Sequence, residues 1–224
     1  MMWHESVALG LAYDSNVPVT ARIPQARVEV RPIRSEDVPA FTSLPPATSP
    51  RAEALTRINA RHLLESGLQT CYVGVTEAGP VYMQFLVTPD QNERLRQVFR
   101  GLFPPLADDE GLLEFAFTLQ EHRAPPVMPA VLLRLIEISA QRGLARVVAY
   151  VHMENQILLR FFLRIGFEPF TVRTERWRLF QRRVEFRPLQ HDVSERLAAR
   201  GGLASPGDVK AGQLPGAASP SADE

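Results

Sequence analysis

The chain has 224 residues, 45% of them apolar, with 25 basic and 25 acidic residues and a formal net charge of zero. A chain of this size can bury a core that needs neither disulfides nor metal, and its single cysteine, Cys71, excludes an intramolecular disulfide framework and a thiolate metal cluster. Because the net charge is zero, the composition predicts no general attraction to nucleic acid or to an anionic membrane.

Composition divides the chain into three regions. Residues 1–26 mix apolar and polar types without sustained periodicity, and Pro18 and Pro24 would interrupt a helix, so we expect an irregular N-terminal leader. Residues 189–224 are rich in Gly, Ala, Pro and Ser and have little to bury, which predicts a largely disordered tail. The remaining residues, 27–188, are expected to form one compact domain.

The first half of this domain begins with a strand and two helices. Apolar Val28, Val30 and Ile33 alternate with charged residues, which predicts a strand that ends near Pro32. Ser35 begins the sequence Ser-Glu-Asp-Val, which is typical of a helix start because acids in the first turn face the positive end of the helix dipole. Further along, we expect a helix from Arg51 to Leu68, a β-hairpin of residues 71–76 and 81–87 around a turn with Gly79, and a helical segment from Pro89 to Gly101.

The second half alternates strands with two amphipathic helices. A strand from Leu112 to Leu119 leads through a loop into a helix with Pro129 in its first turn and Gly143 at its end. The elements that follow are a strand from Arg146 to His152, a helix from Asn155 to Gly166, and strands over residues 170–180 and 183–188. We expect the strands 112–119 and 146–152 to be neighbours. The order predicts an α/β (α+β) domain with a mixed, mostly antiparallel central sheet and flanking helices.

Three segments resemble the GNAT superfamily of acyl-CoA-dependent N-acetyltransferases. The family's first strand and helix resemble VEVRPIRSEDVPAF at 28–41. Its acyl-CoA-binding strand, loop and helix resemble LLEFAFTLQEHRAPPVMPAVLLRLIEISAQRGLARVVAYV at 112–151, and its closing helix and Gly-Phe turn resemble ENQILLRFFLRIGFEPF at 154–170. The resemblance implies the GNAT fold over about residues 28–180. It also implies acetyl-CoA or another acyl-CoA as co-substrate, with no metal.

The resemblance further implies which residues would hold the acyl-CoA. Successive backbone N–H groups at a helix N-terminus can bind a pyrophosphate without basic side chains, and the family's loop supplies such groups. That loop aligns with residues 123–128, and Pro126 stands where the family has glycine, so Pro125 and Pro126 withhold two donors. The implied cofactor-binding residues are Phe117, Thr118, Arg123, Ala124, Val127, Met128 and Asn155.

Glu114 is the candidate catalytic base. It lies on the strand that lines the acyl thioester in the family, where it would take a proton from an amine directly or through water. Strict alternation along this strand places Leu113, Phe115 and Phe117 on one face and Glu114 with Thr118 on the other. The structural alternative for Glu114 is a strand carboxylate in a salt bridge.

The second helix carries two further observations. Asn155 suits the N-cap position, and the resemblance adds a contact to the pantetheine arm or the acceptor. Family enzymes often have Tyr seven residues after this Asn, as the acid that protonates the departing thiolate, whereas this chain has Phe162, which cannot donate a proton. Tyr150 and His152 are then the nearest strand candidates for that role; otherwise the thiolate leaves unaided.

We therefore expect an N-acyltransferase, in the first instance an N-acetyltransferase, that moves an acyl group from acyl-CoA to a primary amine of a small molecule or peptide by direct attack. The acceptor pocket is expected in loops such as 45–51 and 90–109. The alternative is a GNAT-fold module that has lost catalysis and binds a ligand or a protein, and Pro125, Pro126 and Phe162 favour it. No stretch reaches the ~18 apolar residues of a membrane helix and no targeting signal is recognised, so we expect a cytoplasmic protein; a homodimer is left open.

Overall fold

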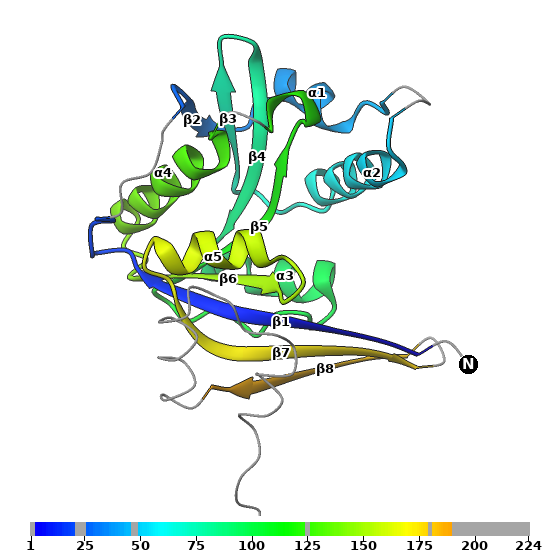
Figure 1. Cartoon of the computed structure of the whole chain (residues 1–224), viewed down its shortest axis with the longest axis vertical. Coiled ribbons are helices and arrows are strands. Elements are labelled where there is room, and N and C mark those ends of the chain that lie inside the picture. The colour runs from blue at the N-terminus through cyan, green and yellow to red at the C-terminus, as the bar shows by residue number, and fades with distance from the viewer. Residues whose placement is uncertain (1–2, 21–25, 46–48, 124–125, 179–180, 190–224) are drawn as a thin grey trace, which may run out of the picture. The chain divides into compact units, whose positions relative to one another are not determined.

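The structure is a computed structural model that describes residues 3–20, 26–45, 49–123, 126–178 and 181–189. The chain forms two compact units, one built from Ala12–Tyr150 and the other from the described residues of Met1–Leu11 and Val151–Glu224. The boundary between them runs through two strands, β1 (Trp3–Asp14) and β6 (Arg146–His152) (Figure 1).

The unit of residues 12–150 is built on a sheet with the strand order β2-β3-β4-β5-β6. Its strands are β2 (Glu29–Pro32), β3 (Cys71–Thr76), β4 (Gly79–Val87), β5 (Glu110–Thr118) and the greater part of β6. Neighbouring strands are antiparallel except β5 and β6, which are parallel. Helix α4 (Val127–Gln141) joins this parallel pair, because parallel neighbours need a crossover connection.

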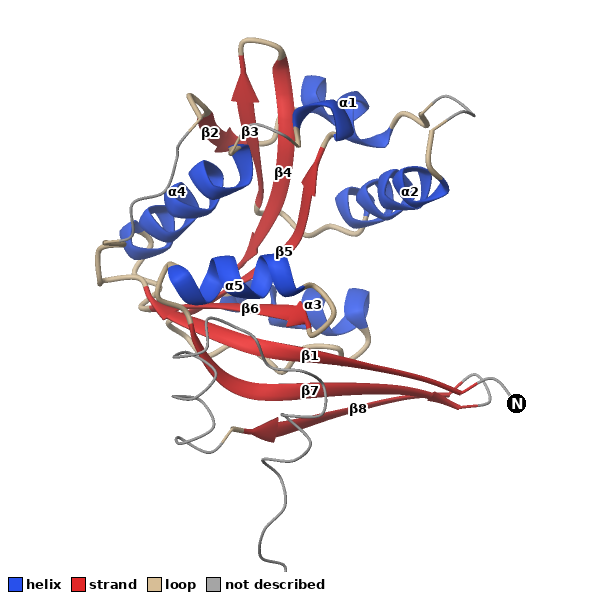
Figure 2. Cartoon of the chain, in the orientation of Figure 1, coloured by secondary structure: helices blue, strands red, loops and turns tan. Residues whose placement is uncertain are grey.

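Helices cover both faces of this sheet (Figure 2). On one face, α4 packs against β3, where Val131 lies beside Gly74. On the other face, Phe41 of α1 (Val38–Thr42) contacts Phe117 of β5, with 6.1 Å between the ring centroids. The remaining helices of the unit are α2 (Arg51–Glu65) and α3 (Asn92–Phe99). Among the described residues, no helix has the length and apolar content that crossing a membrane requires.

Two helix ends show how local backbone geometry sets the boundaries. Helix α2 ends at Glu65 rather than at the predicted Leu68, because Gly67 takes the left-handed φ of 84° and turns the chain away. Helix α4 ends as predicted: Gly143 has a φ of 76°, and the next N–H, that of Leu144, donates to the carbonyl of Ser139 at 3.0 Å. The glycine thus satisfies a helix carbonyl that would otherwise lack a partner.

A buried ion pair connects β2 to α1. The Arg31 guanidinium donates to both carboxylate oxygens of Asp37, at 2.6 and 2.9 Å, and the backbone N–H of Arg34 donates to the same side chain at 2.8 Å. Asp37 closes the 3-10 turn Ser35–Asp37 that precedes α1, and the hydrogen bond from Arg31 holds the pKa of its carboxyl below the usual value. The pair therefore fixes how the chain leaves the sheet to begin its first helix.

The other unit contains the first part of β1, the end of β6, helix α5 (Gln156–Arg164) and the strands β7 (Glu168–Arg178) and β8 (Gln181–Pro188). Its strand order is β6-β1-β7-β8. Just past β6, the N–H of Met153 donates to the carbonyl of Val7 in β1 at 2.9 Å. Strands β7 and β8 form an antiparallel hairpin, which confirms the two strands predicted at the end of the domain.

The predicted irregular leader over residues 1–26 is wrong for its first half, because Trp3–Asp14 forms β1. Ala8 and Leu9, which point to opposite faces of this strand, are both buried. A strand covered on both faces shows no alternation of apolar and polar residues, and that alternation is the signal on which the prediction relied. Residues 21–25, and the predicted tail from residue 190 onward, lie outside the described residues, and the domain boundaries at 27 and 188 stay predictions.

We predict that Gly74→Ala lowers the free energy of unfolding by about 1–3 kcal/mol, the usual cost of overpacking a core. A Cβ at Gly74 would lie 2.7 Å from Val131 Cγ2 and 3.0 Å from Val28 Cγ1. Val131 is fully buried and β-branched, so it can give way only if α4 moves. Urea unfolding followed by circular dichroism measures the loss.

Gly111→Ala is the matched control for this substitution. Its new Cβ would meet the terminal methyl groups of Leu144 and Leu86 at 3.0 Å, and these can rotate aside. If Gly74→Ala lowers the free energy of unfolding no more than Gly111→Ala does, this result would contradict tight packing of α4 on β3.

Candidate functional site

Strands β5 and β6 lie side by side for only part of their length. Their parallel pairing runs from Glu110↔Arg146 to Leu113↔Ala149, and the side chains of Glu110 and Arg146 form an ion pair at its start. Beyond Leu113, the pairing of β5 within the described residues of this unit is with β4. The prediction that these strands are neighbours is confirmed, and the sheet opens between them midway along β5.

An extra residue interrupts β5 where the two strands part. Met83 of β4 lies opposite Phe117 and Phe85 lies opposite Glu114, so a step of two residues along β4 matches three along β5. Phe115 accommodates the extra residue with a φ of 52°, in the left-handed region that residues with a side chain seldom adopt. The bulge bends β5 and changes where its side chains point.

The bulge also corrects the predicted alternation of β5. Cross-strand partners share a face of the sheet, so Glu114 and Phe117 lie on the same face, although strict alternation placed them on opposite faces. One inserted residue is enough, because the side-chain period of a strand is two residues. Phe117 is buried there and Glu114 is partly exposed.

Arg57 of α2 connects this face of β5 to the helices. Its guanidinium carbon lies 5.8 Å from the centroid of the Phe117 ring. The same group donates to Oε1 of Glu53, with a shortest distance of 2.9 Å, and to the carbonyls of Ala40 and Ser43 at 2.6 and 3.3 Å. Arg57 and Glu53 are both buried. A single side chain therefore links the end of α1, the first half of α2 and the bulged strand.

An open cavity of about 740 Å³ borders this network. Its volume is in the range of small-molecule sites, and two carboxylates, those of Glu53 and Glu121, stand on its wall. Part of the loop 45–51, which the sequence indicated for the acceptor, lies along it, although residues 46–48 are outside the described residues. The described lining residues are Ser43, Leu44, Pro45, Ser49, Pro50, Glu53, Arg57, Gln120 and Glu121.

The segment after β5 carries the predicted cofactor residues of this unit. Arg123 is exposed, and its Nε donates to the carbonyl of Thr118 at 3.4 Å, so the structure brings these two residues together. Pro126 precedes the first turn of α4, where Val127 is buried and Met128 is partly exposed. Ala124 and Pro125 lie outside the described residues, so the predicted role of Ala124 stays a prediction.

The start of α4 fits an anionic group of the kind found in CoA. The backbone N–H groups in the first turn of a helix have no partner within the helix, and they lie at its positive end. This helix is 15 residues long and has no acidic residue in its first turn. Pro129 supplies no N–H, so the donors that remain in this turn are those of Val127, Met128 and Ala130.

Asn155 and Phe162 belong to the other unit. The Asn155 side chain accepts a hydrogen bond from the N–H of Leu158 at 3.2 Å, which confirms its capping role and leaves its predicted cofactor contact a prediction. Phe162 is buried, and its ring meets that of Phe167 edge-on with 4.6 Å between centroids. The residue at the position of the family's Tyr therefore serves as core packing.

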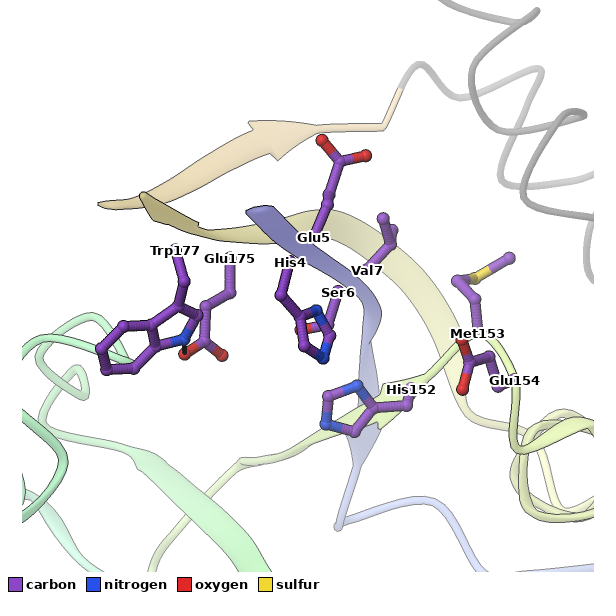
Figure 3. A pocket seen from close by; sticks show the side chains of 9 residues that line it. All are labelled: His4, Glu5, Ser6, Val7, His152, Met153, Glu154, Glu175 and Trp177. Atoms are coloured by element: carbon purple, nitrogen blue, oxygen red, sulfur yellow. Dashed lines mark hydrogen bonds between the residues drawn. The ribbon is translucent and has the colours of Figure 1, made fainter. Parts of the chain in front are cut away.

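The same unit holds a second pocket, of about 520 Å³ (Figure 3). The imidazoles of His4 and His152 point toward one another, and the indole of Trp177 stands beside them with its Nε1 donating to Glu175 at 2.8 Å. The pocket is lined by His4, Glu5, Ser6, Val7, His152, Met153, Glu154, Glu175 and Trp177. Of these, the sequence indicated only His152, because His4 lies in the supposed leader and residues 170–180 were predicted only as a strand.

The described residues also bear on thiol chemistry and on metal ligands. Cys71 is buried, and this burial raises the pKa of its thiol to about 12, so it is not a thiolate nucleophile at neutral pH. No group of three or more His, Cys, Asp or Glu side chains in the described part of the chain is arranged to hold a metal ion.

Comparison with known proteins identifies the fold. No protein-family profile and no curated protein matches the sequence. Among solved structures, the chain is similar to the GCN5-related glucosamine N-acetyltransferase region of a fungal multi-domain GH3 β-N-acetylglucosaminidase, with a TM-score of 0.53 and 14% identity over 76% of this chain and 21% of that chain.

Two bacterial structures are similar at a lower score. One is a GNAT-family acetyltransferase from Colwellia psychrerythraea, with a TM-score of 0.49 and 11% identity over 85% of this chain and 58% of that chain. The other, from Novosphingobium aromaticivorans, is assigned to the same family and has a TM-score of 0.49 and 17% identity over 76% of this chain and 63% of that chain. The chain thus spans between 21% and 63% of these three structures. At a TM-score of 0.53 and 14% identity, the likeness to the fungal N-acetyltransferase region shows the fold alone, and the predicted GNAT fold is confirmed.

We predict that His152 titrates below the ordinary histidine pKa of 6.5. Its ring is partly desolvated, which disfavours the charged imidazolium, and the positive charge of Arg173 adds to this, while Glu175 and Glu154 act in the opposite direction. NMR titration of the imidazole, assigned with His152→Gln, measures the pKa. Glu154→Gln should lower it further, because that substitution removes a nearby negative charge.

The lowered pKa of His152 also determines whether the free energy of unfolding rises or falls with pH. Between the native pKa and 6.5 the unfolded chain binds more protons than the folded one, so the free energy of unfolding falls as the pH is lowered through that window. A native pKa at or above 6.5 would contradict the assigned burial and charges.

Proposed function

We propose that the chain is an N-acyltransferase that moves an acyl group, in the first instance acetyl, from acyl-CoA to a primary amine. The observation that carries the proposal is the parting of β5 from β6 beyond Leu113, at a bulge, with the N-terminus of α4 following the same strand. The GNAT fold supports it, because the resemblance assigns the acyl-CoA to this strand, loop and helix.

The acyl-CoA would be held through its phosphates by the first turn of α4. The N–H groups of Val127 and Met128 point along a helix whose positive end favours an anion, and the exposed Arg123 adds a cation nearby in the chain. Thr118 and Phe117, at the end of β5, would border the acyl arm. The co-substrate supplies an acyl group already activated as a thioester.

Glu114 would then act as the base. A neutral amine attacks the thioester carbonyl, the new C–N bond forms, the C–S bond breaks, and the proton lost by the amine passes to the carboxylate of Glu114 directly or through water. Backbone N–H groups of β5 near Phe117 would polarise the carbonyl oxygen. Because Phe162 cannot donate a proton, the CoA thiolate leaves unaided or takes its proton from solvent.

The acceptor in this proposal is an amine of a small molecule or peptide. The cavity beside α1 and α2 supports such an acceptor, because Glu53 and Glu121 offer carboxylates while Leu44, Pro45 and Pro50 offer apolar surface. We place the reaction in the cytoplasm, since Cys71 is a free thiol and a reducing compartment keeps it so.

A second candidate function is a GNAT-fold module without catalysis that binds a ligand or a protein. The observation that favours it is the burial of Phe162 among aromatic rings, together with the missing N–H of Pro126. Calorimetric titration with acetyl-CoA separates the two functions. The acyltransferase requires binding, and no binding at millimolar acetyl-CoA would leave the non-catalytic module.

We predict that Glu114→Gln lowers the turnover number about 100-fold or more, the size expected when a positioned proton acceptor is lost. The affinity for acetyl-CoA should stay within a few-fold of wild type, because the carboxylate acts on the amine. Steady-state kinetics with a verified acceptor, together with calorimetry, measures both quantities. Glu77→Gln, in the exposed turn between β3 and β4, is the control for loss of a carboxylate elsewhere in the unit. Unchanged turnover in Glu114→Gln would mean that water or a histidine, and not Glu114, accepts the proton from the amine.

We also predict that Pro126→Gly tightens the binding of acetyl-CoA, because glycine restores an N–H at the start of α4. The same substitution should cost about 0.4–1 kcal/mol of stability, since glycine adds freedom to the unfolded chain. Titration and thermal melting read the two effects separately. Weaker binding in the variant would mean that the proline shapes a competent pocket and that the account of the missing donor is wrong.

A further inference from the structure

The pocket of Figure 3 is not used by the mechanism above. It lies wholly within the unit formed by the end of β6, the first part of β1, and β7. Strand alternation decides which side chains enter it: His4 and Ser6 on β1, and Glu175 and Trp177 on β7, lie on the pocket face. Glu5 extends away from the two imidazoles and pairs with Arg176 at 2.8 Å.

The charged groups that line this pocket are carboxylates. Glu154 and Glu175 bring them, and the lowered pKa of His152 favours its neutral ring, which offers one lone pair beside its N–H. No Lys or Arg is among the described residues that line the pocket. Within the described residues Glu154 is exposed and has no ion-pair partner, so its charge is available to a ligand.

Two arginines lie near the pocket without lining it. Arg173 is buried and its positive charge lowers the pKa of His152, whereas Arg182 has a negative counterpart in Glu175, with its Nη1 3.9 Å from Oε1. Arg182 is also the cross-strand partner of Trp177 and lies 5.9 Å from its ring centroid. The indole is thus already part of one cation–π contact.

Trp177 is held in place and is nevertheless accessible. Its Nε1 donates to Glu175 at 2.8 Å and Arg182 lies over its ring, yet 42% of the residue is exposed. Donation from the N–H to a carboxylate enriches the ring in electrons, which strengthens its attraction for a cation. A rigid aromatic wall loses little entropy when a ligand binds, so this side chain is preorganised for contact.

We propose that this pocket binds a small organic cation: an ammonium group placed between Glu154 and the imidazoles, with an apolar body against Trp177. The volume of about 520 Å³ suits a ligand of metabolite size. An anion would face two carboxylates and is disfavoured. The site is independent of the acyl transfer proposed above, and it needs no acyl-CoA.

Three probes that share a phenyl ring test the charge preference. They are N,N-dimethylbenzylammonium, which is cationic and cannot be stably N-acylated, benzyl alcohol, which is neutral, and benzoate, which is anionic. Calorimetry on the full chain without acyl-CoA should show the cation binding most tightly and benzoate not at all. The indole Nε1–H NMR signal of Trp177, assigned by comparison of Trp3→Phe with Trp177→Phe, should shift only with the bound cation.

Two variants locate the binding. Trp177→Ala should weaken the binding of the cation about 5- to 30-fold, as expected when the aromatic wall against the phenyl ring is lost. Glu154→Gln should weaken it about 3- to 10-fold, as expected for one exposed charge pair. Glu168→Gln, an exposed glutamate on β7 that does not line the pocket, should change nothing. Trp177 and Glu154 are both exposed, so the variants should fold, and thermal melting checks this.

Each outcome decides for or against the proposal. If benzyl alcohol and the ammonium bind equally well, the pocket recognises the apolar ring and not the charge, and the proposed cation site is wrong. Cation binding that survives Trp177→Ala and Glu154→Gln would place it elsewhere on the chain. No binding of the ammonium at 50 mM, on the order of the weakest specific contacts, would overturn the proposal outright. None of these results depends on whether the chain transfers an acyl group, so the two proposals can fail separately.

Discussion

Strand β5 pairs with two neighbouring strands that run in opposite directions, β4 and β6. It pairs in parallel with β6 over Glu110 to Leu113 and antiparallel with β4 as far as Thr118, and the ion pair of Glu110 with Arg146 holds the parallel end. The inserted residue at Phe115 releases the strand from the straight path that would have kept it beside β6. The opening of the sheet, the face occupied by Glu114 and the course of the chain into α4 all follow from this one bulge.

A second constraint acts through a buried charge. A guanidinium removed from water must be matched by hydrogen bonds, and Arg57 finds them in Glu53 and in the carbonyls of Ala40 and Ser43 at the end of α1. The last carbonyls of a helix have no partner within it, so the N–H groups of the arginine and the carbonyls at the end of α1 supply each other's hydrogen bonds. Arg61 repeats the arrangement with the carbonyl of Thr42 at 2.7 Å. Helix α2 thereby fixes the wall of the cavity beside β5.

The two pockets differ in how their polar groups are supported. In the cavity of α1 and α2, Glu53 is held by Arg57 in a buried pair, whereas Glu121 is exposed. In the pocket of β1, β6 and β7, the imidazoles and Glu154 face the space directly, whereas Glu5 and Glu175 are held by neighbouring side chains.

The sequence by itself determined those features that depend on short-range patterns. The hairpin of β3 and β4, the N-cap at Asn155, the glycine that ends α4 and the order of the strands and helices along residues 28–188 each follow from residues near one another in the chain. Only the tertiary structure decided the rest. Strand β1 was hidden because it is buried on both faces, the bulge at Phe115 because no glycine marks it, and the pocket of His4, His152 and Trp177 because its members are distant in sequence. Local patterns report the burial and dihedral preferences of single elements, whereas a register shift or a convergent pocket is set by pairing energies between elements that the chain order does not reveal.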